Sequence, residues 1–119
     1  VGFRVVGHGN SFRIENRMPG ADANPYLAFA ATLVAGMAVV HEQLDCGEIY
    51  EGNAYVDEKL PALPESLQEA TALLDSSKLA RQTLGDAVVD YYVHTARLEQ
   101  KAWNNSVTDW EHQRYFERI

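Results

Sequence analysis

Apolar and polar positions alternate along the first part of the chain with the two-residue period of a β-strand. Residues 1–6 contain three valines and Phe3 with one charge at Arg4, and residues 12–17 place ions at every second position. Side chains of a strand point alternately to its two faces, so both stretches are predicted to be strands. Residues 7–11 contain two glycines, which favours a hairpin that makes the strands antiparallel. Two strands alone form a marginal sheet, so we expect them to belong to a larger one.

From residue 24 onward the period becomes that of helices. Asn24 followed by Pro25 is typical of a helix start. This helix is predicted to reach about residue 44, and its apolar positions lie almost all the way round, as in a buried helix. The sheet is its expected neighbour, and a dimer interface is the alternative.

Residues 45–64 contain glycines, prolines and acidic residues and are predicted to form a loop. A helix is then expected to open at 63–67 and run to about 74, followed by a short helical turn at 75–84 and a long helix at 86–103. A capping box at residues 108–111 predicts a last helix, whose aromatic side chains are expected to dock on another surface. The long helix is expected to bury five side chains and to expose three charged ones: Val89, Tyr92, Val93, Ala96 and Trp103 inside, and Asp90, Arg97 and Lys101 in water.

These elements predict an α+β fold, with two antiparallel strands followed by a mostly helical segment. Residues 1–19 would hold the strands and the candidate site, and residues 20–119 the helical part. The chain begins without methionine in a predicted strand, so we expect it to be a portion of a larger protein.

The second predicted strand carries the candidate chemistry. Alternation puts Arg13, Glu15 and Arg17 on one face, with the Glu15 carboxylate between two guanidinium groups. A carboxylate is a ligand for a hard divalent cation, and guanidinium groups bind phosphate or carboxylate in pairs of hydrogen bonds. The alternative is an ordinary ladder of charges on a solvent-facing strand, which would contribute little.

Charge narrows the class of partner. The 119 residues carry a formal net charge of -7, but the first 20 hold three arginines against Glu15 alone. An acidic body disfavours nucleic acid and anionic membrane, whereas a local positive cluster suits a small anion. The sequence has one cysteine, so an internal disulfide is excluded, and its apolar runs are shorter than the roughly 20 residues that span a bilayer. We therefore expect a cytoplasmic protein that binds neither nucleic acid nor membrane.

The ionic strand is the beginning of a longer sequence pattern. The chain reads RIENR, then MPGADANPYLAFAATLVAGM, and the pattern described next is unbroken from Arg13 to Gly36. This resembles the C-terminal catalytic segment of the glutamine synthetases and related γ-glutamyl-amine ligases, and the likeness returns faintly between Trp110 and Phe116.

The resemblance implies a role for each ion. Glu15 would hold Mg²⁺ or Mn²⁺ at the nucleotide phosphates, and Arg17 would be the catalytic arginine that binds glutamate and the phosphoryl group in transfer. Arg4 and Arg13 would contact ATP. Asn10 departs from the family pattern, because many members carry lysine there, and this removes one expected phosphate contact.

The implied reaction is ATP-dependent ligation of glutamate with ammonia or another amine through γ-glutamyl phosphate. The implied partners are the rest of the catalytic domain and further subunits of a homo-oligomeric ring. Because one carboxylate cannot fill a divalent metal site, we expect the isolated chain to be inactive. A non-catalytic relative that keeps the fold is the alternative.

Tyr55 lies where some family members are adenylylated, but its surroundings match poorly, and we expect a packed tyrosine without that role.

Overall fold

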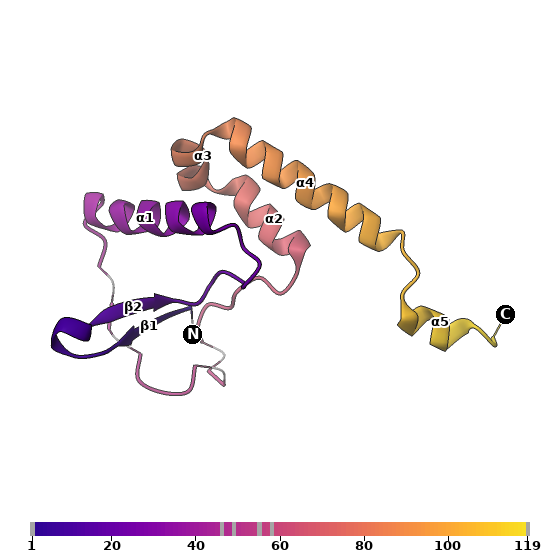
Figure 1. Ribbon diagram of the computed structural model, residues 1–119, viewed down its shortest axis with the longest axis horizontal. Coiled ribbons are helices and arrows are strands. Elements are labelled where there is room, and N and C mark those ends of the chain that lie inside the picture. The colour runs from indigo at the N-terminus through magenta and orange to yellow at the C-terminus, as the bar shows by residue number, and fades with distance from the viewer. Residues whose placement is uncertain (1, 46, 49, 55, 58, 119) are drawn as a thin grey trace. The chain divides into compact units, whose positions relative to one another are not determined.

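The computed structural model describes residues 2–45, 47–48, 50–54, 56–57 and 59–118. The chain forms two compact units, Val1–Ala62 and Leu63–Ile119, whose elements are labelled in Figure 1. Within the described residues, the first unit holds two strands, a short 3-10 turn and one long helix, and the second holds four helices. Val1 and Tyr55, for which the sequence predicts a strand position and a packed loop tyrosine, lie outside the described residues.

The first unit begins with the expected hairpin. Strands β1 (Phe3–Val6) and β2 (Arg13–Asn16) pair antiparallel. Their connection contains a short 3-10 turn, Gly9–Ser11. Gly7 has a φ of 84°, and a methyl group there would lie 2.1 Å from the backbone oxygen of Ser11, so this turn requires glycine. The prediction of two antiparallel strands is confirmed.

Helix α1 (Pro25–His41) starts where the sequence predicts. The Asn24 side chain accepts hydrogen bonds from the backbone nitrogens of Tyr26 and Leu27, at 3.0 and 3.4 Å. Pro25 occupies the first turn, where no N–H is needed. The helix ends three residues before the predicted position 44, and Gln43 just beyond it has a φ of 51°.

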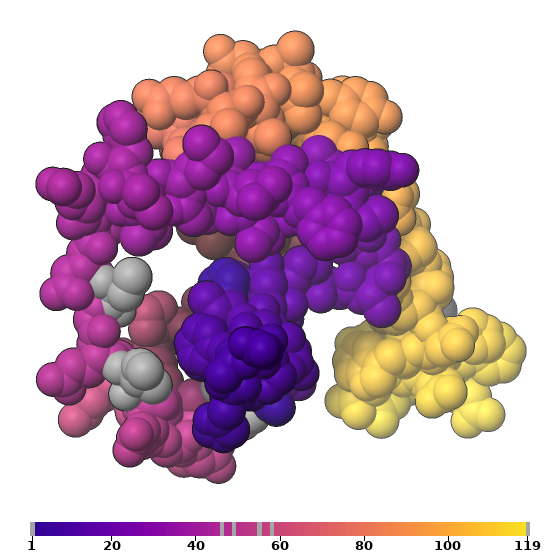
Figure 2. Space-filling model, turned by 60° about the vertical axis from the view of Figure 1, so that its left-hand side comes forward, coloured from indigo at the N-terminus to yellow at the C-terminus, as the bar shows by residue number. Residues whose placement is uncertain are grey.

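The expectation that α1 is buried is wrong for this chain. None of its residues is buried, and five large apolar side chains on its outer side are 67% to 83% exposed: Tyr26, Phe29, Leu33, Met37 and Val40. Figure 2 shows α1, in violet, with one side uncovered along its length. The reason is geometric, because a helix that is apolar all round needs neighbours on every side. Within the described part of the chain, only one side of α1 is half-buried.

The second unit contains α2 (Leu67–Ser76), α3 (Lys78–Leu84), α4 (Asp86–Asn104) and α5 (Asp109–Tyr115). Helix α4 packs against α2 and α3, and its core side chains are Val89 and Val93, at 1% and 3% exposed. They are four residues apart and so lie on one narrow face of α4. Tyr92 and Trp103 are exposed, at 37% and 65%, because no other described element covers them, which corrects the prediction that both are buried.

Side-chain caps start three of these helices. Ser66 and Ser77 cap α2 and α3, and Thr108 with Glu111 forms the expected capping box of α5. The aromatic side chains of α5 and its C-cap are exposed, and the surface on which they would dock stays a prediction. Across the described residues, every helix is too short or too polar to cross a membrane.

Candidate functional site

The hairpin brings Arg4, Arg13 and Glu15 together on one face. Arg4 lies directly opposite Glu15 in the strand register, and its Nε is 3.5 Å from Glu15 Oε2. Arg13 reaches the other carboxylate oxygen, with Nη2 3.6 Å from Oε1. Glu15 is 35% exposed and both arginines are more exposed than that. The carboxylate thus sits between two guanidinium groups that still have donors free for a ligand. Alternation along the second strand predicted that Arg13 shares a face with Glu15, whereas the position of Arg4 opposite Glu15 depends on the strand register.

Arg17 follows directly after β2. Its backbone nitrogen donates to the oxygen of Gly2 at 2.8 Å, so the ladder continues through it, and alternation puts it on the face of Glu15. The Arg17 side chain is exposed. Among the described residues it has no ion-pair partner, so its guanidinium group is available to an anion.

Asn16 points to the opposite face and connects β2 to α1. Its Nδ2 donates to Thr32 Oγ1 at 2.8 Å, and its Oδ1 accepts from the backbone nitrogen of Met18 at 3.0 Å. Sequence reasoning missed this contact, because nothing local in the sequence pairs residues that are 16 positions apart.

The charges of this face determine what it can bind. It holds three arginines and one carboxylate, and so suits a polyanion such as a nucleotide phosphate or a dicarboxylate. The described residues contain no group of three potential metal ligands. A free divalent cation beside Glu15 would also meet the positive charges of Arg4 and Arg13. Glu15 therefore fits as one ligand of a metal site whose other ligands come from elsewhere.

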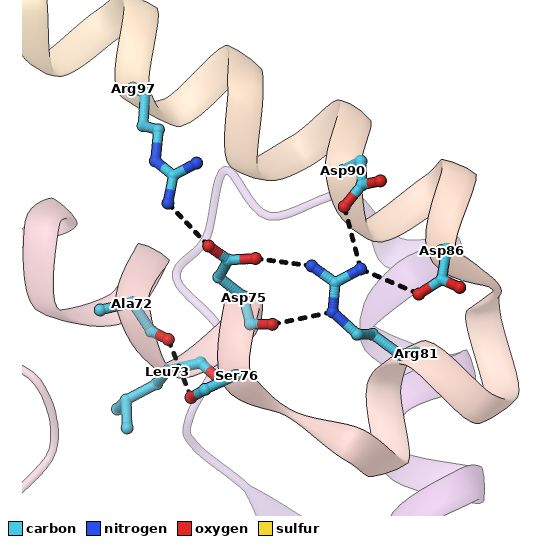
Figure 3. Close-up of polar contacts among 8 residues, drawn as sticks. All are labelled: Ala72, Leu73, Asp75, Ser76, Arg81, Asp86, Asp90 and Arg97. Atoms are coloured by element: carbon cyan, nitrogen blue, oxygen red, sulfur yellow. Dashed lines mark hydrogen bonds and ion pairs between the residues drawn. The ribbon is translucent and has the colours of Figure 1, made fainter.

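A second ionic cluster, in the helical unit, centres on Arg81 of α3 (Figure 3). Arg81 Nη2 is 2.5 Å from Asp75 Oδ1, and Nη1 is 2.9 Å from both Asp86 Oδ1 and Asp90 Oδ1. Arg97 contacts the other oxygen of Asp75 at 2.7 Å. The cluster thus joins α2, α3 and α4.

These contacts shift the protonation equilibria. The hydrogen bonds from Arg81 and then Arg97 lower the pKa of Asp75, and the three aspartates raise the pKa of Arg81. The ions satisfy one another, so we assign the cluster to helix packing. Sequence reasoning did not find Arg81. Asp86 and Asp90 lie one helical turn apart on the same face of a helix, and this spacing could have indicated that they share a cationic partner.

Comparison with known proteins identifies the family. Residues 1–115 match the family model described as glutamine synthetase, catalytic domain. The chain belongs to the glutamine synthetase family. Its α+β arrangement, two antiparallel strands followed by helices, is a portion of the glutamine synthetase catalytic domain, as predicted.

Three relatives show the range of named activities within the glutamine synthetase family. The γ-glutamylethanolamide synthetase GlnA4 of Streptomyces coelicolor is 47% identical over 98% of this chain and 25% of the relative. Type-1 glutamine synthetase 2 of Dictyostelium discoideum is 39% identical over 100% and 24%. The glutamate–isopropylamine ligase of a Pseudomonas species is 36% identical over 97% and 26%. The chain spans about a quarter of the length of these relatives.

Proposed function

We propose that this chain supplies part of the active site of an ATP-dependent ligase that joins the side-chain carboxylate of glutamate to an amine. The observation that carries the proposal is the cross-strand arrangement of Arg4, Glu15 and Arg13 in a chain of the glutamine synthetase family. The reaction moves negative charge between oxygens, and preorganised cations stabilise such charge.

Each ion has a proposed role. Arg4 and Arg13 bind ATP phosphates, since each keeps donors that Glu15 does not use. Arg17, unpaired within the described residues, binds the glutamate carboxylate and the phosphoryl group in transfer, and is the catalytic residue of this portion. Glu15 contributes one carboxylate to the site of Mg²⁺ or Mn²⁺. When bound, that ion would neutralise charge on phosphate oxygens.

The proposed chemistry has two steps. A glutamate side-chain oxygen attacks the terminal phosphorus of ATP, ADP leaves, and γ-glutamyl phosphate forms. The amine nitrogen then attacks the acyl carbon, phosphate leaves, and the amide product loses a proton. Arg17 is suited to both steps because its planar fork can follow the same anionic oxygens throughout.

We propose an alkylamine or amino alcohol as the acceptor. Two relatives that match nearly the whole chain are named for ethanolamide and isopropylamine products or substrates. Ammonia is the second candidate, because the 39% identical relative is named a glutamine synthetase. Phosphate release by the complete protein, measured with glutamate, ATP and a panel of amines, would distinguish the two. A ring-shaped homo-oligomer and a cytoplasmic location stay predictions.

The site assignment is tested in the complete protein with Arg17→Ala. We expect its KM for glutamate to rise by about tenfold or more, as removal of a charge-assisted pair implies. Arg114→Ala is the matched control, since Arg114 lies on α5 and has no ion-pair partner among the described residues. Unchanged glutamate kinetics in Arg17→Ala would contradict the assignment. A complete protein that binds no nucleotide in the presence of Mg²⁺ would instead favour a non-catalytic relative, which the substitution of Asn10 for lysine allows.

A further inference from the structure

A continuous chain of hydrogen bonds runs from α1 to the backbone beside Arg17. The Thr32 hydroxyl donates to the backbone oxygen of Ala28 at 2.7 Å. Thr32 Oγ1 also accepts from Asn16 Nδ2 at 2.8 Å, and Asn16 Oδ1 accepts from the Met18 nitrogen at 3.0 Å. A hydroxyl has one proton, so Thr32 can only accept from Asn16. The amide orientation of Asn16 is therefore fixed from both ends.

These hydrogen bonds hold the residues on both sides of Arg17. The residue before it is tied to α1, and the residue after it is tied back to Asn16. Its own nitrogen is bonded to Gly2 of the neighbouring strand segment. Of the side-chain hydrogen bonds within the described residues, the one from Asn16 to Thr32 alone joins β2 to α1. Arg17 lies just beyond β2, so the bond from Asn16 to Thr32 adds to the backbone bond with Gly2 in holding this position.

We infer that Asn16 and Thr32 are positioning residues for Arg17, holding its backbone at a fixed place relative to Glu15 so that its guanidinium group meets the glutamate carboxylate. The inference rests on the function proposed above. The physical reason is preorganisation, since a binding group works best when neighbouring contacts hold it within about 0.5 Å of its productive position. Arg4 and Arg13 lie within regular strands, so their nucleotide contacts do not depend on this bond.

The test uses the complete protein and three variants of the pair. Thr32→Val keeps the branched shape and removes the hydroxyl, Asn16→Ala removes the partner, and Thr32→Ser restores the hydroxyl. Thr95→Val is the matched control. Thr95 Oγ1 donates to the Tyr91 backbone oxygen at 2.9 Å, the same contact with the preceding helical turn that Thr32 makes, but it accepts no side-chain hydrogen bond among the described residues.

We expect Thr32→Val to raise the KM for glutamate about fivefold, which corresponds to about 1 kcal/mol, the net size of one hydrogen bond. Asn16→Ala should raise it by at least as much, because this variant also loses the bond from the Met18 nitrogen. The KM for ATP should stay unchanged. The double variant should resemble Asn16→Ala, because Asn16→Ala already loses the bond to Thr32 as well as the bond from the Met18 nitrogen. Thr32→Ser and Thr95→Val should retain the parent kinetics.

Two results would overturn the inference. One is an unchanged KM for glutamate in both Thr32→Val and Asn16→Ala, and the other is an equal rise in both KM values, which general loosening would produce. Arg17→Ala, measured in parallel, separates this failure from that of the proposed function. If Arg17→Ala impairs glutamate use and the pair variants do not, only the positioning role fails. If Arg17→Ala has no effect, the proposed function fails as well.

Discussion

Replacing Glu15 by glutamine should change nucleotide affinity in opposite directions with and without a divalent cation. In the structure the carboxylate lies 3.5 Å from Arg4 and 3.6 Å from Arg13. A phosphate bound by the same two guanidinium groups would be a like charge close to this carboxylate. Two like charges at about 4 Å in water repel by about 1 kcal/mol. Without the cation, Glu15→Gln should therefore bind nucleotide about fivefold more tightly.

With Mg²⁺ the sign reverses, because glutamine cannot replace a carboxylate ligand of a hard cation. Loss of even an outer partner of a metal ligand costs about 10- to 100-fold in affinity, so we expect a weakening of at least that order. The measurement is calorimetric titration of the complete protein with a non-hydrolysable ATP analogue, in Mg²⁺ or in EDTA. Ionic strength should be well below 0.1 M, where the screening length is about 10 Å or more.

Glu99→Gln serves as the control, since it makes the same change in net charge on α4, in the other unit. It should leave both affinities unchanged. The reasoning is refuted if Glu15→Gln shifts affinity in the same direction under both conditions, or if Glu99→Gln reproduces its effect.

Three further predictions concern the 119-residue chain itself. Val89→Ala removes two buried methyl groups at about 0.8 kcal/mol each, so amide exchange in α2 and α4 should quicken about tenfold. Val88→Ala makes the same change in helix propensity at a half-exposed site and should have a smaller effect; equal effects would contradict the assigned core. The hydrogen bond from Arg81, then that from Arg97, lowers the pKa of Asp75 below 3.8. This contribution stabilises the folded form above pH 3.8 and is lost as the pH falls through the folded-state pKa. Asp75→Asn should accordingly show a weaker acid dependence of thermal unfolding by circular dichroism, and an identical dependence would count against the cluster. The unmodified chain should release no phosphate from ATP with glutamate, an amine and Mg²⁺, because it offers one metal carboxylate; measurable turnover would disprove this.

Features encoded by neighbouring residues could be predicted from the sequence. The hairpin follows from alternation and a glycine turn, and α1 and α5 begin at the capping residues Asn24 and Thr108. The shared face of Arg13 and Glu15 follows from the two-residue period of a strand. Each of these conclusions needs information from only a few consecutive positions.

Features that depend on distant residues could not be predicted in the same way. The opposition of Arg4 and Glu15 depends on the strand register, and the bond from Asn16 to Thr32 depends on where α1 lies against β2. Burial was also misjudged. Trp103 is 65% exposed, because an apolar side chain is buried only where a neighbouring element covers it.

The length of the connection between β1 and β2 determines which side chains of the two strands lie opposite each other. Gly7 cannot carry a side chain there, and the Ser11 hydroxyl closes the turn by donating to the His8 oxygen at 2.8 Å. Because side chains alternate, adding or deleting one residue between the strands would send Arg4 to the side opposite Glu15. The length of this turn is thus as much a part of the ionic arrangement as the charged residues themselves, and an insertion of one residue would need a compensating bulge to restore it.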